Sequence, residues 1–354
     1  EAGWSSGMIG TSGAMVAIAA LTTAPFMPPV LRWMGLPGFL AAAAVLSAAS
    51  LVAFPVYESF MAWLGLRYVQ GIAATALFLG SENWIVADAE EGARGRIIGL
   101  YATVLSLGFA SGPLLLTAVG HAGALPFAVC AVLSLICILP LITAWQDAPK
   151  ADAEDAAAIP PLRFLVTDPT VMGAVILFGA IEFGVMALMP VWGVKSGFSA
   201  DASAFLVTTL VLGNVAFQMP LGALADGLNR RAMLVGCAFS CVAAAAALPW
   251  LVGESWVLWL VLFIWGGIAA GLYTIALIEL GARYKWQTLV SANAAVIIGY
   301  GIGALVGPLF VGGAMDLIEP HGLSLALGVM ASAYLAVAVL RARRRPSSLD
   351  SASP

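Results

Sequence analysis

The sequence predicts an all-α polytopic membrane protein built from two pseudo-symmetric helix bundles. Three observations support this prediction: the composition, the succession of long apolar segments, and the recurrence of short motifs in both halves. The chain of 354 residues is 62% hydrophobic and only 10% charged. Because soluble domains carry about 25% charged residues, water cannot be the solvent for most of this surface.

Eleven segments are apolar enough to cross a bilayer, for which a helix needs about 20 mostly apolar residues. Most connections between them are short and rich in Gly, Pro or charged residues, which favours a turn at each membrane surface. The predicted spanning segments are 5–27, 36–54, 59–86, 97–118, 124–145, 170–193, 202–224, 231–252, 255–280, 288–315 and 322–340.

One connection is longer and more polar than the others. It contains a charged cluster between Lys150 and Asp155, followed by Pro160-Pro161, a composition typical of a linker. Five predicted segments precede it and six follow, so we expect eleven of twelve helices here and one further helix ahead of Glu1. The predicted parts are an N-terminal bundle over 1–145, a cytoplasmic linker over 146–169, a six-helix C-terminal bundle over 170–340 and a basic cytoplasmic tail over 341–354.

The positions of Lys and Arg indicate which connections face the cytoplasm, because cytoplasmic loops are enriched in both residues. With the 27–36 connection in the cytoplasm, every Lys and Arg falls on that side except Lys195, which lies opposite, and Arg67, which lies within a helix. The reverse orientation would place nearly all of them outside. We therefore predict a multi-pass protein with a cytoplasmic C-terminus.

Short motifs recur in the same order in the two halves. The sequence Gly71-Ile-Ala-Ala74 returns as Gly267-Ile-Ala-Ala270. The sequence Gly108-x-x-x-Gly112-Pro113 returns as Gly303-x-x-x-Gly307-Pro308. Both offsets are close to 195 residues, which indicates an internal repeat of helix-packing motifs.

A basic turn, defined as residues 222–231, separates two apolar segments of the second half. It combines glycines that permit close backbone approach with one carboxylate and two cations. The same composition is also compatible with an ordinary cytoplasmic loop that carries arginines. The sequence of the basic turn is Gly222-Ala-Leu-Ala-Asp226-Gly-Leu-Asn229-Arg230-Arg231.

The first half holds a degenerate copy of the basic turn. At a similar offset, residues 28–36 align with it, with Arg32 in place of the aspartate and Gly35 in place of the asparagine. The sequence therefore predicts that the two halves differ at this connection, and that only the second half carries the full motif.

The basic turn resembles the loop signature between the second and third helices of each half of major facilitator superfamily transporters. The resemblance extends along the chain, because Arg67-x-x-Gln70-Gly71 is similar to the family's fourth-helix motif, which is associated with proton coupling. The segment Gly108 to Pro113 is similar to the fifth-helix antiporter motif, although leucines follow where that motif has a glycine pair.

Two further stretches resemble an uncharacterised bacterial (YcaD-like) branch of that family: Glu82 followed by Arg94-Gly95-Arg96, and Gly179 to Pro190 with Glu182 inside it. The resemblance implies a bacterial inner-membrane protein with twelve helices in two bundles and alternating access to a central cavity. It also implies that the glycine, aspartate and arginines of the basic turn form a cytoplasmic gate. It implies no particular substrate.

Charged residues inside predicted helices cost at least about 2.5 kcal/mol each, so each requires a partner or a cavity. Arg67 could bind an anionic group or be a structural anchor, and we favour function because Gln70 lies one turn further on. Glu182 lies near mid-helix, where an apolar environment favours the protonated carboxyl that a proton carrier requires. The alternative is a glutamate that only packs. We predict that Arg67, Gln70, Glu82, Glu182 and Glu279 form a proton-coupling or charge network.

Within that network, Glu82 and Glu279 stand near the cytoplasmic ends of their helices. Their depth favours ion pairs with nearby arginines that lock the gate over titration during transport. The resemblance implies that Asp226 meets the positive N-terminal end of a helix. The sequence leaves two candidates for that helix, one beginning near Ile97 and one near Leu289.

Polar residues within apolar helices are candidates for a cavity lining. Asn214 and Gln218 lie four residues apart and therefore share a helix face, while Tyr273 and Asn293 are isolated in other segments. Taken alone, such a residue is more often a hydrogen-bonding group between helices than a ligand contact.

Other function classes lack sequence support. The four cysteines lie in apolar runs, the two histidines lack zinc-site spacing, and no phosphate-binding loop is present. We therefore expect no catalytic residues, no metal and no nucleic-acid partner. The predicted partners are the bilayer and a small molecule, with a proton as coupling ion and a monomer as the expected state.

The sequence thus predicts a secondary active transporter that moves a small molecule by alternating access and is coupled to protons. Two alternatives stay open: an uncoupled facilitator of a sugar or metabolite, and a transport-silent membrane sensor or scaffold on the same fold.

Overall fold

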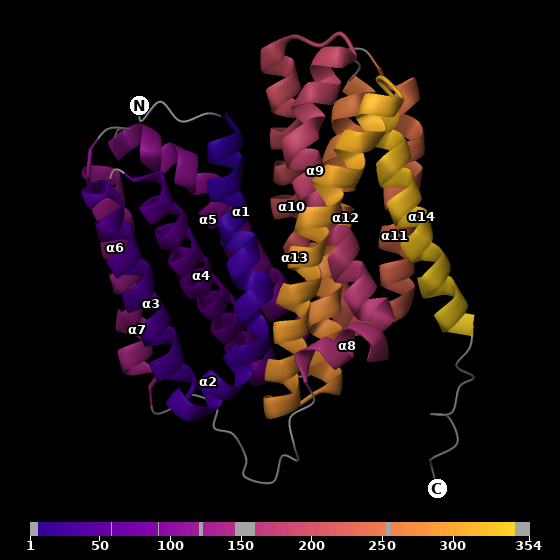
Figure 1. Ribbon diagram of the computed structural model, residues 1–354. Helices are drawn as coiled ribbons and strands as arrows, with labels where there is room; N and C mark the ends of the chain where they lie inside the picture. Colours follow the sequence, from indigo (N-terminus) through magenta and orange to yellow (C-terminus); the bar gives the residue numbers. More distant parts are fainter. Residues whose placement is uncertain are drawn as a thin grey trace, which may run out of the picture. The chain divides into compact units, whose positions relative to one another are not determined.

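The computed structural model describes residues 6–57, 59–90, 92–119, 123–145, 160–252 and 256–343, and the regular structure within these ranges is entirely helical (Figure 1). Helices suit an apolar solvent because they satisfy their backbone hydrogen bonds internally, where lipid offers none. The all-α prediction is confirmed. The start of the chain (1–5), the centre of the predicted linker (146–159) and the end of the predicted tail (344–354) lie outside the described residues.

The helices follow the predicted segments in order. Those that precede the predicted linker are α1 (Ser6–Thr23), η1 (Ala24–Phe26), α2 (Met27–Met34), α3 (Leu36–Ala53), η2 (Phe54–Val56), α4 (Phe60–Asp88), α5 (Arg94–Val119), α6 (Leu125–Ile136) and α7 (Ile138–Thr143). The later ones are α8 (Pro161–Thr167), α9 (Pro169–Lys195), α10 (Ala200–Gly227), α11 (Arg230–Ala247), η3 (Leu248–Trp250), α12 (Trp256–Arg283), α13 (Trp286–Leu317) and α14 (Gly322–Arg343).

Ten helical stretches of the described residues are long and apolar enough to cross a membrane. The remaining predicted segment, 97–118, lies within α5. Three details differ from the sequence prediction. The connection predicted over 27–36 is mostly helical, because α2 occupies Met27–Met34 and residues Met15–Met34 form one candidate membrane span. The segment predicted over 124–145 is interrupted at Cys137, where α6 ends and α7 follows. The predicted linker contains α8, whose Phe164 is buried.

By their internal contacts, the residues form two compact units. Unit 1 comprises 1–89, 107–164 and 280–301, and unit 2 comprises 90–106, 165–279 and 302–354. The first part of α5 therefore belongs to unit 2, and the first part of α13 belongs to unit 1. The predicted division at the linker stays a prediction.

Small residues allow helices to approach closely within unit 1. There α3 packs on α4 and α6, and α1 packs on α4. A Cβ added at Gly71 would lie 2.6 Å from Cβ of Ala19 and 2.9 Å from Cα of Val16, so only glycine fits between α4 and α1 at this point.

Unit 2 uses the same device between α13 and α9. A Cβ at Gly303 or Gly307 would overlap backbone atoms of Ile176 or Ala180. In the same unit α9 packs on α10 and α14, and α11 packs on α14. This packing positions the faces of α9 and α10 that form the candidate site.

Candidate functional site

Asp226, at the end of α10, binds the N-terminal end of α5, and both lie in unit 2. Its Oδ1 accepts a hydrogen bond of 2.5 Å from the amide of Gly95, and its Oδ2 accepts one of 3.2 Å from the amide of Arg96. The first N–H groups of a helix have no partner within the helix and carry partial positive charge. The structure therefore selects α5 from the two helices that the sequence left open.

Three glycines make this contact sterically possible. A Cβ at Gly95 or at Gly222 would overlap the backbone carbonyl oxygen of the other residue. One turn further along α5, a Cβ at Gly99 would lie 2.8 Å from the carbonyl oxygen of Gln218. The backbones of α5 and α10 thus touch directly, and any side chain at these positions would push the helices apart.

The arginines of the basic turn pair with Glu279 of α12. Glu279 lies 3.8 Å from a guanidinium nitrogen of Arg230 and 3.7 Å from Nε of Arg231. Arg230 also donates to the carbonyl oxygen of Ala225. Asn229 begins α11, because its side chain accepts hydrogen bonds from the amides of Arg231 and Ala232. The ion pair expected for Glu279 is present.

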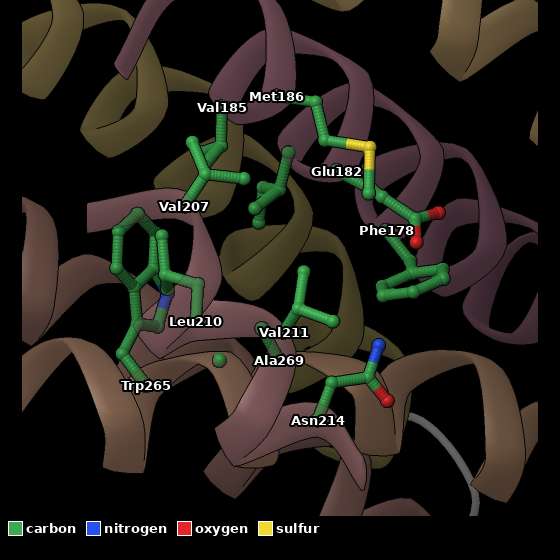
Figure 2. A pocket seen from close by; sticks show the side chains of 12 residues that line it. Phe178, Glu182, Val185, Met186, Val207, Leu210, Val211, Asn214, Trp265 and Ala269 are labelled. Atoms are coloured by element: carbon green, nitrogen blue, oxygen red, sulfur yellow. The ribbon is translucent and has the colours of Figure 1, made fainter. Parts of the chain in front are cut away.

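A pocket lies within unit 2 between α9, α10 and α12 (Figure 2). Its cavity volume is about 50 Å³, which holds a few water molecules at the ~10–15 Å³ that each requires. This is too small for a whole drug-sized ligand, whose pockets span about 300–1,000 Å³. The lining consists of Phe178, Ile181, Glu182, Val185, Met186, Val207, Leu210, Val211, Asn214, Trp265, Gly266 and Ala269.

The pocket lining is mostly apolar, and its two polar side chains, Glu182 and Asn214, lie at one side. Figure 2 shows the carboxyl group of Glu182 and the amide of Asn214 on the same side, with the ring of Phe178 between them. Trp265 and Leu210 form the opposite side. Such a lining is typical of a small-molecule site, in which a few polar groups orient a mostly apolar ligand.

Three side chains, those of Asn214, Gln218 and Thr274, form a hydrogen-bonded ladder that extends away from the pocket. Nε2 of Gln218 donates to Oδ1 of Asn214 at 2.6 Å, and the hydroxyl of Thr274 donates to Oε1 of Gln218. Gln218 is 3% exposed and Thr274 is fully buried. Asn214 and Gln218 were predicted on one face of α10, and of these two residues only Asn214 lines the pocket.

Arg67 and Gln70 have separate environments in unit 1. The guanidinium carbon of Arg67 lies 5.6 Å from the centroid of the Phe54 ring, within the range of a cation–π interaction. Gln70 instead connects α4 to α3, since it donates to Ser47 and accepts from Ser50. The contacts of Gln70 are those of a helix-packing group.

The remaining predicted site residues lie outside the pocket lining. The ring of Tyr273 is 5.7 Å from that of Phe178, which does line the pocket. Glu82 and Asn293 are fully buried, both in unit 1. Gly108 has open space around it, and Gly112 and Pro113 lie in α5. Pro308 lies within α13, one residue after Gly307.

Sequence reasoning did not identify the apolar lining of the pocket, and it gave no contact to Gly95, Gly99 or Thr274. Gly95 and Gly99 are spaced by one helical turn, which is a detectable sign of close helix packing. Thr274 carries no such sign, because a lone threonine in an apolar helix usually bonds to its own backbone.

Comparison with known proteins gives a consistent result. The model of the Major Facilitator Superfamily matches residues 1–285 and 195–354. The uncharacterized MFS-type transporter YfkF of Bacillus subtilis (strain 168) is 25% identical over 316 residues, which cover 86% of this chain and 79% of that protein. The uncharacterized MFS-type transporter YcaD of Escherichia coli O7:K1 is 25% identical over 306 residues, which cover 86% and 78%.

Solved structures of transporters are similar in fold. FucP, crystallised in the outward conformation, has a TM-score of 0.77 at 12% identity, covering 96% of this chain and 91% of its own. The human organic anion transporter MFSD10 has a TM-score of 0.74 at 16% identity, covering 93% and 83%. At these identities the likeness shows the fold, and it confirms the fold that the sequence predicted.

Proposed function

The chain belongs to the Major Facilitator Superfamily, and we propose that it is a secondary active transporter that moves a small molecule by alternating access, coupled to protons at Glu182. The observation that carries this proposal is the position of Glu182. Glu182 is one of the few polar residues in a pocket lining that is otherwise mostly apolar, and it lies on a helix long and apolar enough to cross a membrane.

An ionised carboxylate is costly in such surroundings, whereas a protonated one is not. A change of surroundings between two conformations therefore changes the proton affinity of this group. A group that binds a proton in one conformation and releases it in the other links proton movement to the conformational cycle. FucP is described as a fucose:proton symporter, which supports proton coupling as chemistry that this fold can host.

The contact between Asp226 and α5 is suited to the conformational part of the cycle. It consists of two hydrogen bonds, a set of glycine contacts and the nearby ion pairs of Glu279, all without covalent links. Contacts of this kind can break and re-form between two packed states. We assign Gly222, Asp226, Arg230 and Arg231 to a gate that these contacts hold closed.

The distribution of Lys and Arg supports a cytoplasmic location for this gate and for the C-terminus. The bacterial origin of YfkF and YcaD supports the inner membrane as the location. We expect the protein to act as a monomer and without a bound cofactor.

The test is a flux measurement in proteoliposomes that contain a pH-sensitive dye. A panel of small metabolites is added outside, and entry of a coupled substrate changes the internal pH. The wild type should give a pH signal with at least one compound. Glu182→Gln should abolish that signal yet keep exchange of the same labelled compound across the membrane, because exchange needs no net proton movement.

Glu319→Gln is the matched control, since Glu319 pairs with Lys195 outside the pocket. That variant should retain the full signal. Full gradient-driven uptake by Glu182→Gln would contradict the proposal. Uptake without any pH signal in the wild type would instead indicate an uncoupled facilitator, and the absence of any flux would favour a sensor or scaffold.

A further inference from the structure

The ladder behind Asn214 fixes which end of its amide faces the pocket. The hydroxyl of Thr274 donates to Oε1 of Gln218, so the remaining polar atom of that amide, Nε2, must donate onward. It donates to Oδ1 of Asn214. An asparagine has one acceptor atom and one donor atom on its amide, so Nδ2 is the atom left to face the pocket.

The view in Figure 2 agrees with this order, since the nitrogen of Asn214 is on the side of the amide nearer Phe178 and Glu182. The polar side of the pocket therefore holds two groups of opposite character. Nδ2 of Asn214 can only donate a hydrogen bond, and an ionised Glu182 can only accept one. The two groups belong to neighbouring helices, α10 and α9.

We propose that Gln218 and Thr274 are positioning residues that hold the Asn214 amide in this orientation, and that the pocket consequently takes a ligand head group that both accepts and donates hydrogen bonds, such as a primary amide or a hydroxyl. The head group accepts from Nδ2 of Asn214 and donates to Glu182. The inference deepens the proposed function by naming its substrate class, and it rests on that function only in taking this pocket to be the substrate site.

The apolar side and the size of the pocket complete the description of the ligand. Trp265, Leu210 and Val207 offer no charged group, so the body next to the head group is apolar. The cavity volume of about 50 Å³ admits a short chain but not a bulky ring system. We therefore expect a small amphipathic molecule, or the small end of a larger one.

The first experiment measures binding of three probes that match in size: butanamide, methyl propyl ketone and pentylammonium. Butanamide donates and accepts, the ketone only accepts, and the ammonium only donates. Binding is followed by saturation-transfer NMR on the protein in nanodiscs, with empty nanodiscs as the blank for lipid partition. Butanamide should bind the wild type roughly three- to tenfold more tightly than the ketone, because the ketone loses one hydrogen bond. Pentylammonium can also form an ion pair with an ionised Glu182, so its affinity is compared between the wild type and the variants and not with the neutral probes.

The decisive variant is Asn214→Asp. It keeps an oxygen to accept from Gln218 and replaces the amide nitrogen with a second acceptor. The variant should therefore lose binding of the ketone, and it should bind pentylammonium more tightly than the wild type does. A wild type that binds the ketone as tightly as butanamide, or a variant whose affinities for the three probes are unchanged, would overturn the proposal.

The positioning role is tested by Thr274→Val, which removes the donor that orients Gln218. Thr209→Val is the matched control, because the hydroxyl of Thr209 donates to the backbone of Phe205 on the same helix as Asn214. Thr274→Val should lower the affinity for butanamide relative to that for pentylammonium by about threefold or more, although Thr274 is not part of the pocket lining. Thr209→Val should leave that ratio of affinities unchanged.

A merely structural role for the ladder would lower thermal stability in Thr274→Val and leave the probe preference intact, which would contradict the inference. Binding in nanodiscs requires no proton gradient and no transport. Failure of the probe preference therefore refutes the ligand class alone, whereas failure of the flux test in proteoliposomes refutes the transport function.

Discussion

The basic turn and its degenerate copy occupy matching places in the two halves, yet their structures differ. In the basic turn, Asn229 caps α11 with its side chain, and Asp226 binds two backbone amides of α5. In the copy, Gly35 stands at the start of α3 without a side-chain cap, at φ 71°, and Arg32 is an exposed residue in the last turn of α2. One connection is held by polar contacts and the other by glycine geometry.

The second repeated motif differs between the halves in the same direction. Gly303 and Gly307 lie against the backbone of α9, whereas nothing lies within 4 Å of a Cβ added at Gly108. A repeat in the sequence therefore predicts helix position but not contact. In both motifs the second half makes the close contacts that its residues permit, and the predictions below test that difference.

The largest effect is expected for Gly222→Ala, because the added Cβ would overlap the backbone of Gly95. Forcing a methyl group into a filled contact costs about 1–3 kcal/mol. Gly227→Ala is the control, since nothing lies within 4 Å of a Cβ there. Thermal unfolding in detergent should show a clear loss for Gly222→Ala alone, and equal stabilities would contradict the direct backbone contact.

Next in size is Asn229→Ala, which removes the side-chain cap of α11 and should cost about 1 kcal/mol. The comparison is Arg32→Ala in the degenerate copy, for which we expect a change within about 0.5 kcal/mol because the side chain is exposed. Chemical denaturation of the two variants would measure both. A cost at Arg32 as large as that at Asn229 would remove the asymmetry.

A smaller loss, on the order of 1 kcal/mol or less, is expected for Glu279→Gln, because its ion pairs with Arg230 and Arg231 are long and partly exposed. The loss should shrink as the salt concentration rises, since salt screens partly exposed charges. Thermal unfolding at low and high salt measures this, and a salt-independent loss would indicate a packing effect instead.

The smallest effect is expected for Gly108→Ala. The new methyl group meets open space, and alanine favours a helix over glycine by up to about 1 kcal/mol. Stability should therefore stay constant or rise slightly, whereas Gly303→Ala should lower it. Similar losses in thermal unfolding for both variants would show that the two motifs pack alike.

Much of the fold followed from the sequence because hydropathy and length act on each segment by itself. Every predicted spanning segment is helical over most of its described residues, although the local break at Cys137 carried no sign in the apolar run around it. The Lys and Arg distribution and the repeats added order and symmetry. These signals concern one helix at a time, so they left the packing partners undetermined.

The site was less predictable for the same reason. The sequence identified Asp226 and predicted that it binds the N-terminal end of a helix. It could not decide between the helix that begins near Ile97 and the one that begins near Leu289. It placed Asn214 and Gln218 on one face without showing that only the first reaches a pocket. The role of Thr274 depends on the packing of α12 against α10, which no local pattern encodes.

The central claim is that Asp226 of the intact basic turn holds the N-terminal end of α5. Hydrogen–deuterium exchange of a peptide that covers Gly95 and Arg96 tests it most directly, because the amides of these two residues donate to the side chain of Asp226. The next amide, that of Ile97, donates to the backbone carbonyl of Ala93 and does not depend on Asp226. We predict that Asp226→Ala accelerates exchange in this peptide and that Arg32→Ala leaves the wild-type rate. Unchanged exchange in Asp226→Ala, or equal acceleration in both variants, would contradict the account.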